Sequence, residues 1–500
     1  MQQYVPTDVI ICGAGAAGLT LALDLARRGV AFRLLEQRDA PFNGSRGKGI
    51  QPRTQELLED LGVLDRMVAA GGFYPPQRMH QADGSHIDSP VVEVGVATPA
   101  EPYTLPLMVP QFLAEATLRE RLAELGHRPE FGNAVVGFVQ DDDGVTVEVE
   151  GRAGRSTQRA RYLVGADGGR SFVRRTLGIG FPGRSLGARA VVADIALTGL
   201  SRDAWHRFNS EDKEAQMALC PLAGTDLFQL QAPVPLEGEV DLSAAGLMAM
   251  VAARTGRHDI RIDSVAWASA YAMSARLADH YRCGRVLLMG DAAHTHPPTG
   301  GQGLNTSMQD AYNLGWKLAA VLEGASQALL DTYEEERRPI AADMLGMATR
   351  LLDAARQGDM RRGREVQQLD LGYRQSTLSR HAADRSGERL QAGDRAPDAL
   401  LRGAAGQGRR LFEVFRGTHW TLFGFETTAT PFAPRPGLHI HRIGAGGELV
   451  DETGQVRTAY ALSAGDWVLV RPDGYIAAIR AANDAAAMED QLRDLGLAAA

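Results

Sequence analysis

The chain has 500 residues, enough for two or three domains with hydrophobic cores of their own. Its 44% hydrophobic and 23% charged residues are typical of a globular protein, and the net charge of −8 gives no reason to expect nucleic acid or an anionic membrane as a partner. The three cysteines, Cys12, Cys220 and Cys283, have neither disulfide-framework nor metal-ligand spacing, so we expect a cytoplasmic location and no bound metal.

The N-terminal segment has the pattern of a βαβ unit. Residues 9–12 are an apolar run typical of a buried strand, residues 16–28 have helical spacing, and residues 31–35 are the next strand. Between the first strand and the helix stands Gly13-Ala14-Gly15-Ala16-Ala17-Gly18, a GxGxxG pattern that binds a dinucleotide diphosphate at a helix N-terminus. The uncharged run 9–23 is too short to span a bilayer and lacks a preceding basic region, so we expect no targeting segment.

An acidic residue follows the second predicted strand. Glu36 comes about twenty residues after the fingerprint, where an acid accepts hydrogen bonds from an adenosine ribose. We include its neighbours Gln37 and Arg38 in the candidate cofactor site. By itself this unit is compatible with NAD, with FAD or with a structural turn that binds nothing.

Two further glycine motifs each follow a predicted buried strand. Residues 161–165 lead into Gly165-Ala-Asp167-Gly168-Gly169-Arg170-Ser171, and residues 285–289 lead into Gly290-Asp291. An acid at the carboxyl end of a parallel strand lies where ligands bind in open α/β sheets, so Asp291 can accept from a sugar-alcohol hydroxyl such as the ribityl chain of FAD. Asp291 can also be the cap of the segment that follows.

A loop rich in glycine and proline follows at residues 295–303, before a long predicted helix at 304–322. Glycine keeps side chains away from a neighbouring ligand, and the helix N-terminus offers N–H groups and a positive dipole end to the anionic edge of a reduced flavin. This second motif favours FAD over NAD. His294 and His296 are candidate bases, but packing of the loop or of the flavin is the favoured role.

In this order, the three motifs resemble those of the class A flavoprotein monooxygenases, the para-hydroxybenzoate and phenol hydroxylase group. Residues 310–318 and 333–339 match the helices that follow in that family. The resemblance is closest to the three-domain branch that hydroxylates phenols, aromatic polyketides and some antibiotics. It implies an α/β fold with a Rossmann-like FAD-binding domain, an inserted β-sheet substrate domain and a thioredoxin-like C-terminal domain.

The resemblance also implies a role for individual residues. Arg46 and Pro297 match catalytic positions beside the flavin, Gln111 matches a cofactor contact, and Val135 and Val136 match backbone at the adenine. From the residues alone, Arg46 can also be a solvated surface arginine and Gln111 a plain helix start. The implied cofactor-binding set is Gly13, Ala14, Gly15, Ala16, Ala17, Gly18, Glu36, Gln37, Arg38, Arg46, Gln111, Val135, Val136, Asp167, Asp291, Pro298, Gly301, Gly303, Leu304 and Asn305.

The expected domains are interleaved along the chain. Residues 1–75, 102–175 and 276–390 are assigned to the FAD-binding domain, and residues 76–101 and 176–275 to the substrate domain. Strand-like runs at 191–197, 216–222 and 227–231 are expected to form a sheet that roofs the flavin, with the substrate between the two domains. Candidate substrate contacts are Met217, Leu219, Pro221, Phe228 and Tyr271, each of which can equally be plain core.

The C-terminal part is expected to be a separate domain at 391–500, after a helix and linker at 353–395. Strands are predicted at 419–425 and 438–443, a hairpin at 466–471 and 475–479 around Pro472-Asp473-Gly474, and a last helix at 484–495. Because this region has no cysteine, a thiol redox role is excluded. A structural or association surface is expected, and a homodimer is common among the look-alikes.

The implied reaction is a hydroxylation. NADPH or NADH reduces FAD, O2 gives a flavin C4a-hydroperoxide, and an electron-rich carbon of a small aromatic substrate takes one oxygen while the protein excludes water. The tyrosine relay of some relatives has no match here. Other flavin chemistry remains open, namely a dehydrogenase, an epoxidase, a Baeyer-Villiger-type oxygenase or an antibiotic-modifying oxygenase. A halogenase is disfavoured because its paired-tryptophan motif is absent, and a non-catalytic flavin- or ligand-binding protein is the alternative from another class.

Overall fold

The central sheet consists of short, almost entirely apolar strands. The computed structural model describes residues 7–92, 95–212, 214–297, 301–356, 362–381 and 390–497. The sheet has the order β17-β18-β11-β1-β2-β7, parallel except for β17. Apolar strands fit this position because helices and loops cover both faces. The strands are β1 Val9–Cys12, β2 Phe32–Glu36, β7 Glu130–Phe131, β11 Tyr162–Gly165, β17 Arg282–Cys283 and β18 Val286–Leu288.

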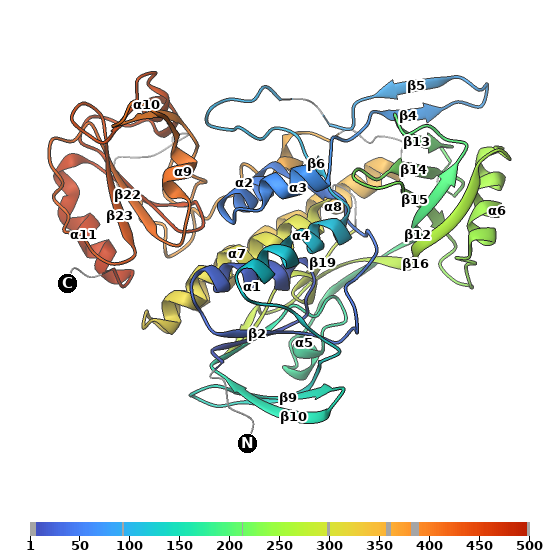
Figure 1. Cartoon of the computed structure of the whole chain (residues 1–500), viewed down its shortest axis with the longest axis horizontal. Helices are drawn as coiled ribbons and strands as arrows, with labels where there is room; N and C mark the ends of the chain where they lie inside the picture. Colours follow the sequence, from blue (N-terminus) through green and yellow to red (C-terminus); the bar gives the residue numbers. More distant parts are fainter. Residues whose placement is uncertain are drawn as a thin grey trace.

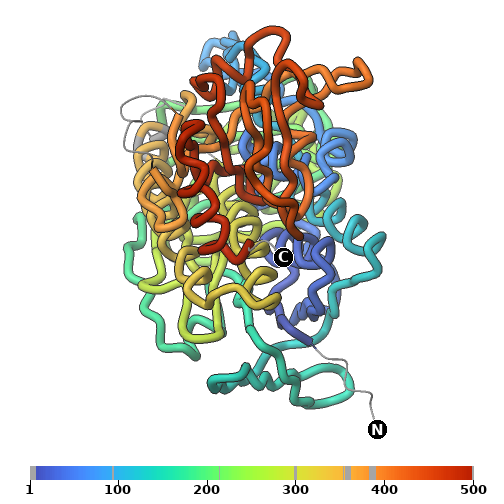
Figure 2. The backbone as a smooth tube through the Cα atoms, turned by 90° about the vertical axis from the view of Figure 1, so that its left-hand side faces the viewer, coloured from blue at the N-terminus to red at the C-terminus, as the bar shows by residue number. Residues whose placement is uncertain are grey.

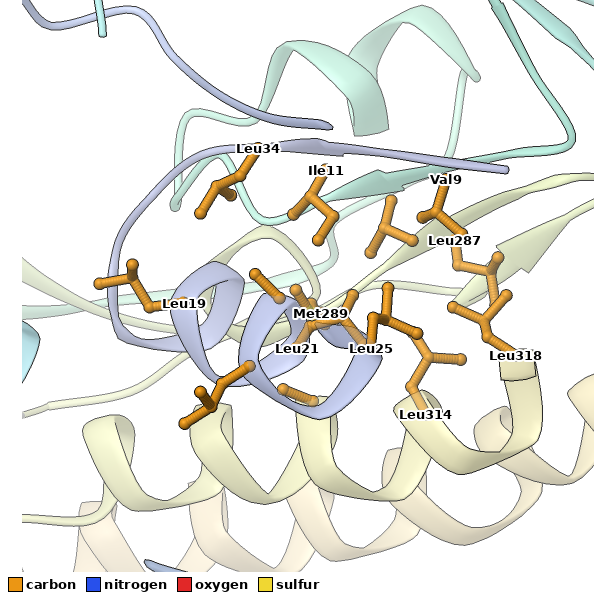
Figure 3. Close-up of a cluster of buried hydrophobic side chains, with 14 of the residues drawn as sticks. Val9, Ile11, Leu19, Leu21, Leu25, Leu34, Leu287, Met289, Leu314 and Leu318 are labelled. Atoms are coloured by element: carbon orange, nitrogen blue, oxygen red, sulfur yellow. The ribbon is translucent and has the colours of Figure 1, made fainter. Parts of the chain in front are cut away.

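Two helices stack in succession on this sheet. Helix α1 (Ala16–Arg27) lies between the sheet and helix α7 (Gln302–Leu322), and its leucines fill the space between strand β1 and Leu314 and Leu318 of α7 (Figure 3). Each fully buried leucine contributes about 1.5–3 kcal/mol. The other helices of this part are α2 Pro52–Asp60, α3 Leu64–Ala70, α4 Gln111–Glu124, α5 Phe172–Thr176 and α8 Asp331–Arg356.

Two small antiparallel sheets accompany the central one. The first has the order β10-β9-β8, and β8 contacts β2 at one end and, through Gln140, the Cys283 carbonyl of β17 at the other. The second pairs β3 with β6. Their strands are β3 Gly49–Ile50, β6 Leu107–Met108, β8 Ala134–Gln140, β9 Val145–Gly151 and β10 Gly154–Ala160.

An eight-stranded sheet lies to one side of the central sheet (Figure 1). We call it the roof sheet, and its order is β19-β16-β12-β15-β14-β13-β4-β5. Helix α6 (Ala244–Thr255) packs on one face through Leu247 and Val251, and the other face meets the loop that contains Ser45. The strands are β4 Gln77–His80, β5 His86–Ser89, β12 Gly183–Thr198, β13 Trp205–Phe208, β14 Met217–Pro221, β15 Phe228–Val234, β16 Arg261–Leu277 and β19 His294–Thr295.

The three strand runs that the sequence predicts in this region correspond to β12, β14 and β15. The long strand β16 is absent from the sequence prediction, and it pairs with β12 through three register shifts. The small and aromatic residues of β16 do not alternate regularly between apolar and polar, so the period-two pattern on which strand prediction depends is missing.

The C-terminal part forms a seven-stranded sheet with the order β21-β20-β24-β23-β22-β25-β26. Its elements are β20 Leu400–Gly403, β21 Gly408–Arg410, β22 Trp420–Phe425, β23 Leu438–Ile443, β24 Leu449–Val450, β25 Trp467–Val470, β26 Ile476–Arg480, α9 Leu411–Phe415, α10 Gln455–Tyr460 and α11 Ala485–Asp494. The predicted strands, hairpin and last helix agree with these bounds to within one residue.

The linker region is described in part. Helix α8 reaches Arg356, the last described residue before a gap, and the described residues 362–381 and 390–395 contain the 3-10 turn Arg364–Gln367 and two isolated bridges, Arg380 to Ala478 and Arg395 to Tyr475. The helix and linker expected within 353–395 fall partly on residues 357–361 and 382–389, which lie outside the described residues.

Alternating side chains place the C-terminal sheet between two sets of helices. Phe423 packs with α9 and α10, whereas its neighbour Leu422 packs with α11 and with Trp316 of α7. In the side view, the C-terminal part lies in front of helices α7 and α8 (Figure 2). Among the described segments, no helix combines the length and hydropathy that crossing a bilayer requires.

A buried ionic cluster joins the C-terminal sheet to α7 and α8. Arg471, which follows β25, donates from both terminal nitrogens to the two carboxylate oxygens of Glu336 in α8, at 2.6 and 2.9 Å. Lys317 of α7 donates to the same carboxylate at 2.7 Å. Asp473, in the turn before β26, accepts from Arg471 at 2.6 Å and from the Trp316 indole at 3.0 Å. The four charged side chains are at most 1% exposed and their formal charges cancel.

Titration of this cluster favours its charged form at neutral pH. Burial by itself raises the pKa of Glu336, but the charges of Arg471 and Lys317 outweigh it and lower that pKa below its ordinary value of 4.5. Burial lowers the pKa of Lys317 to about 8, against the opposing effect of Glu336, so the ammonium stays protonated near pH 7.

We predict that Glu336→Gln lowers the free energy of unfolding by about 3–5 kcal/mol, because it leaves Arg471 and Lys317 buried without their shared anion. The neighbouring exposed Glu335→Gln is the matched control and should cost about 1 kcal/mol or less. Since the folded pKa of Glu336 is below 4.5, its contribution is present above that pH and is lost as the pH falls toward the folded pKa. Urea unfolding at pH 7 checks the comparison, and equal losses in the two variants would contradict it.

Candidate functional site

The three glycine motifs, far apart in the sequence, meet at one edge of the central sheet. The Ala166 amide donates to the Cys12 carbonyl at 2.8 Å, and the Met289 amide donates to the Gly165 carbonyl at 3.0 Å. The turns that follow β1, β11 and β18 are therefore neighbours at the carboxyl ends of parallel strands. This edge is where open α/β sheets bind ligands.

Two glycines of the first motif are required by packing, and the third is not. A Cβ on Gly13, whose φ is +109°, would lie 2.3 Å from the Ala166 carbonyl oxygen, and a Cβ on Gly18 would lie 1.9 Å from the Gly13 oxygen. A Cβ on Gly15 would meet only Glu115 Oε1, at 3.8 Å. Protein packing therefore does not require glycine at position 15, and the close approach of a ligand explains it.

Helix α1 begins without a side-chain cap from its own N-cap residue. Its N-cap, Gly15, has no side chain to accept a hydrogen bond, and its first turn, which contains Ala16, Ala17 and Gly18, has no acidic residue. The N–H groups of the turn and the positive end of the helix dipole favour a phosphate there. Glu115 of α4, which the sequence analysis does not include, lies beside this turn and accepts a hydrogen bond from the Ala16 backbone amide. Burial raises the pKa of Glu115 despite its 2.8 Å hydrogen bond from Gln111.

The predicted ribose-binding residues lie at the end of β2. Glu36 accepts from the Ala14 amide at 2.9 Å and from the Arg38 amide at 3.0 Å, while Gln37 and Arg38 are exposed. The Asn133 amide donates to the Glu36 carbonyl at 2.9 Å, which brings the start of β8 to this end of the site. Val135 (buried) and Val136 (half-buried) are on that strand.

The glycine motif that begins at Gly290 packs against helix α1. A Cβ on Gly290 would lie 3.2 Å from the Ala17 Cβ and 3.1 Å from the Ser307 Cβ of α7. Gly301, with φ +66°, is the N-cap of α7, again with no side-chain cap and no acid in the first turn. Two helix N-termini are thus open at the same edge of the sheet.

The start of α7 is fixed to the segment before β3. Asn305 accepts from the Gln51 amide and donates to the Gly49 carbonyl, both at 2.8 Å, and a Cβ on Gly47 would lie 3.6 Å from Leu304. The backbone amide of Gln111 donates to the Gly47 carbonyl at 3.0 Å, which brings Gln111 close to the start of α7. Pro297 is buried and Gly303 half-buried, whereas Pro298 lies outside the described residues.

Arg46, Asp291 and Tyr271 face one region between the central sheet and the roof sheet. The exposed guanidinium of Arg46 lies 5.5 Å from the Phe42 ring and 6.0 Å from the Trp267 ring. Asp291 is exposed, but surrounding protein limits its hydration and raises the pKa of its carboxyl, against the charges of His294 and Arg46. Burial raises the pKa of Tyr271 to about 12, with Arg46 again acting in the opposite direction.

Asp167 keeps one carboxylate oxygen for another partner. One oxygen accepts from the Val173 amide at 3.0 Å at the start of α5, while the other is buried with no hydrogen bond. Together with Glu36, Asp167 contributes to raising the pKa of the buried Cys12 thiol, for which burial is the main cause. The unpaired oxygen fits a ligand hydroxyl at this edge of the sheet.

The two histidines of the loop are held by neighbouring side chains. His294 is buried, and its Nε2 lies 2.7 Å from Asp310, which also accepts from Arg337 at 2.8 Å. His296 stacks on His294 with ring centroids 6.0 Å apart, and a Cβ on Gly303 would lie 3.1 Å from its ring. Burial, with the neighbouring His294, lowers the pKa of His296 to about 4, so His296 is neutral at pH 7 and fits a role in packing.

The loop that carries Arg46 is anchored to the roof sheet by residues that the sequence analysis does not include. The Ser45 amide and hydroxyl donate to Asp194 of β12 at 2.7 and 2.9 Å, and Gln229 of β15 donates to the Ser45 carbonyl. A Cβ on Gly44 would lie 2.3 Å from the indole of Trp267, so glycine lets the loop reach the roof sheet. Asp194 and Gln229 stand in alternation with apolar neighbours, which is the only hint of their direction in the sequence.

The roof sheet places most of the candidate substrate contacts away from this region. Met217, Leu219 and Phe228 belong to the core between the sheet and α6, and Pro221 shares the strand face of Leu219. Successive side chains of a strand point to opposite faces, so the face toward the flavin motifs carries the other set. Of the five candidates, only Tyr271 is on that face, opposite Ala190 in β12. The face also carries Asp194, Gln229, Gln231, Ala218, Cys220, Trp205 and Arg207.

The residues at this edge of the central sheet match the groups that FAD would present. The space beside Gly15 and the donors of α1 fit a diphosphate, Glu36 fits a ribose, and the open N-terminus of α7 fits the anionic edge of a flavin ring. In the part of the chain that the structure describes, no group of three or more histidine, cysteine, aspartate or glutamate side chains could hold a metal ion.

Comparison with known proteins gives the same class. Residues 6–348 match the family described as FAD binding domain, and residues 390–496 match the family described as Aromatic-ring hydroxylase, C-terminal. The chain therefore belongs to the FAD-binding aromatic-ring hydroxylases, and the fold class predicted from the sequence is confirmed.

Three relatives illustrate this membership. The chain is 41% identical to a flavin-dependent monooxygenase of Mycobacteroides abscessus over 94% of this chain and 96% of the relative. It is 36% identical to the 12-dehydrotetracycline 5-monooxygenase/anhydrotetracycline 6-monooxygenase of Streptomyces rimosus over 94% of both chains. The structure of aklavinone-11 hydroxylase with FAD and aklavinone matches 99% of both chains with a TM-score of 0.84 and 28% identity.

The contrast between the glycines gives a test of the diphosphate position. Gly15→Ala should leave the stability of the apoprotein unchanged, because φ is −76° and the new methyl meets only a 3.8 Å contact. A steric conflict with the cofactor of about 1–3 kcal/mol would lower FAD affinity roughly 5- to 150-fold. Gly18→Ala should instead destabilise the apoprotein, since its Cβ would collide with Gly13. Fluorescence titration with FAD and thermal denaturation of the apoproteins separate the two effects, and wild-type FAD affinity in Gly15→Ala would refute the assignment.

Proposed function

We propose that this protein hydroxylates an aromatic ring of a fused polycyclic substrate, using FAD, O2 and NADPH or NADH. In the net reaction, one atom of O2 enters a ring C–H bond to give C–OH, and the other leaves as water with two electrons from the nicotinamide. The observation that carries this proposal is the convergence of the FAD motifs, Arg46 and the polar face of the roof sheet on one region. The relatives named for anhydrotetracycline and aklavinone support a substrate with several fused rings.

Each part of the site has a separate task in this reaction. When bound, FAD supplies the acceptance of a hydride and the activation of O2. Glu36 and the first turn of α1 hold the adenosine and diphosphate end, and the N-terminus of α7 holds the ring edge. The roof sheet covers the flavin ring and excludes water, so that the activated oxygen is transferred to the substrate and not lost as hydrogen peroxide. Neither loop histidine is assigned as a base, since His294 is bonded to Asp310 and a pKa lowered to about 4 makes His296 a weak proton acceptor.

The cellular setting is also a proposal. The three cysteines are free, with Cys12 and Cys220 buried, which is consistent with a reducing compartment such as the cytoplasm. The domain boundaries at 75/76, 101/102, 175/176, 275/276 and 390/391 remain predictions, as does a homodimer.

Oxygen tracing tests the reaction class directly. We expect a panel of phenols and fused-ring aromatics to include compounds that accelerate NADPH or NADH oxidation by the holoenzyme under air. With 18O2, the product of such a compound should gain one 18O atom in a new hydroxyl group, detected by mass spectrometry. Product without 18O would indicate dehydrogenation, and insertion into a ring C–C bond would indicate a Baeyer-Villiger oxygenase. No acceleration by any compound would favour a binding protein.

Arg46 provides a test of the contact between the flavin and the nicotinamide. Its exposed guanidinium lies near the rings of Phe42 and Trp267, and we propose that it lets the flavin ring move toward the nicotinamide. Arg46→Ala should lower the rate of anaerobic flavin reduction about tenfold, roughly 1.4 kcal/mol, with FAD still bound. The exposed Arg152→Ala, on the hairpin of β9 and β10, is the control and should leave the rate unchanged. Stopped-flow absorbance measures both, and an unchanged rate in Arg46→Ala would reject the role.

A further inference from the structure

Three cationic side chains gather where the loop before β3 meets the roof sheet. Lys48 comes from that loop, Arg207 from β13 and Arg362 from the segment after α8. Lys48 and Arg207 are each 7% exposed. Burial is the main cause that lowers the pKa of each of the three groups, and the charge of Arg362 lowers the pKa values of Lys48 and Arg207 further. The three cations are therefore close enough to repel one another in a poorly hydrated space.

Among the described residues, no carboxylate pairs with either arginine. Arg207 makes one long hydrogen bond, 3.4 Å to Gln77, and its Nε is buried without a partner. Arg362 and Lys48 are the described charges that act together with Arg207, and Tyr74 is the described group that acts on Arg362. Burial raises the pKa of Tyr74 above its ordinary value, so this phenol stays neutral and adds no negative charge.

Lys48 is only partly compensated. It donates to Gln229 at 2.5 Å and lies 4.5 Å from the Trp205 ring, and the charge of Asp194 raises its pKa against the effect of burial. Burial raises the pKa of Asp194 in spite of its bonds from Ser45, so its anionic form is itself disfavoured. Burial also raises the pKa of Cys220 to about 11, so this thiol is protonated and is no counter-ion.

Unused donors lie on the same strand face. Trp205 and Arg207 are two residues apart in β13 and therefore point to the same side of the roof sheet, toward Lys48. The indole Nε1 of Trp205 and the Nε of Arg207 are both buried without an acceptor. A buried donor without an acceptor costs about 1–3 kcal/mol, more when it is charged, and a ligand that accepts from both would remove this cost.

We propose that Lys48, Arg207 and Arg362, with the Trp205 indole, bind an ionised oxygen group of the aromatic substrate, either a carboxylate or a phenolate or enolate. This inference rests on the proposed function, because it identifies the site as the part of the substrate region that selects charge. The location agrees: Lys48 adjoins Gly47, which is packed against Leu304 at the start of α7, where the flavin ring edge is assigned. An anion at the roof sheet would hold one end of a flat substrate while another ring lies over the flavin.

Binding can be measured without turnover. Dissociation constants of aromatic probes are obtained from changes in the visible absorption of bound FAD in the oxidised holoenzyme, with no nicotinamide present. The probes are 1-hydroxy-2-naphthoate and its neutral counterpart 1-naphthol. We expect the wild-type protein to bind the carboxylate at least about tenfold more tightly, the preference that one charge-assisted hydrogen bond provides. Equal binding of the two probes would overturn the proposal.

The variants Arg207→Met and Arg362→Met keep side-chain length and remove the charge. Each should reduce the preference for the carboxylate to about threefold or less, while 1-naphthol binding stays within about twofold of wild type. Arg261→Met is the matched control, because this arginine is exposed on β16 of the same sheet. An unchanged preference in Arg207→Met and Arg362→Met would overturn the proposal.

A second pair of measurements separates a ligand site from a structural one. Removing an unpaired buried charge should leave the thermal midpoint of Arg207→Met unchanged or higher, whereas loss of a structural arginine would lower it.

A further binding experiment tests a phenolate as the anion. It uses a nitrophenol that ionises near neutral pH. In proteins that keep Arg207, binding of this probe should strengthen as the pH rises and the phenol ionises, and in Arg207→Met it should not. Loss of nicotinamide affinity with the aromatic preference intact would assign the charges to the nicotinamide phosphates and overturn the proposal.

The test also stands apart from the proposed reaction. If the carboxylate preference and its loss in Arg207→Met are observed but no compound accelerates NADPH or NADH oxidation, the anion site holds and the hydroxylation proposal fails. If compounds are hydroxylated but bind without regard to charge, the reaction holds and the anion site fails.

Discussion

The close contact of glycine backbones at one edge of the central sheet is the constraint on which the rest of the structure depends. Gly18 lies against Gly13, Gly13 against Ala166, and Gly290 against Ala17 and Ser307, at distances that leave no room for a Cβ or barely admit one. These contacts allow α1 and α7 to pack together on the sheet with both N-termini at the same edge. Two positive helix ends and a stretch of backbone without side chains then stand ready for a long, polyanionic and partly flat cofactor. The roof sheet and the loop with Arg46 complete a site whose base is fixed by these contacts.

The protein treats buried charge in two contrasting ways. Between the C-terminal sheet and the helices, Lys317 and Arg471 are matched by Glu336 and Asp473, each with good hydrogen bonds, so the charges cost little once the parts have docked. The buried cations of the Glu336 cluster have acidic partners, whereas Arg207 and Arg362 under the roof sheet have none among the described residues. The imbalance near Lys48 is therefore better explained by a ligand than by imperfect packing.

Which face of each roof-sheet strand is turned toward the loop with Ser45 was only partly predictable from the sequence. The β15 run was predicted as a strand, and its alternation of Phe228 and Leu230 with Gln229 and Gln231 was visible. Hydrophobic character suggested that the apolar set would meet an aromatic substrate. In the structure, that set meets α6, and the polar set meets the loop with Ser45. Period two defines the two faces of a strand, but which face is covered by a helix depends on a connection that returns from elsewhere in the chain.

By itself, the sequence determined the elements whose physics is local. The GxGxxG turn, the apolar parallel strands and the hairpin at Pro472-Asp473-Gly474 each depend on φ/ψ preferences and hydrophobic runs within a few residues, so they could be read from the chain. Only the tertiary structure decided the rest. The anchoring of Ser45 to Asp194 joins residues 149 positions apart, the contact of Arg471 with Glu336 joins residues 135 positions apart, and the gathering of Lys48, Arg207 and Arg362 involves three separate segments. Electrostatic and hydrogen-bond partners are set by distance in space, which no local pattern encodes.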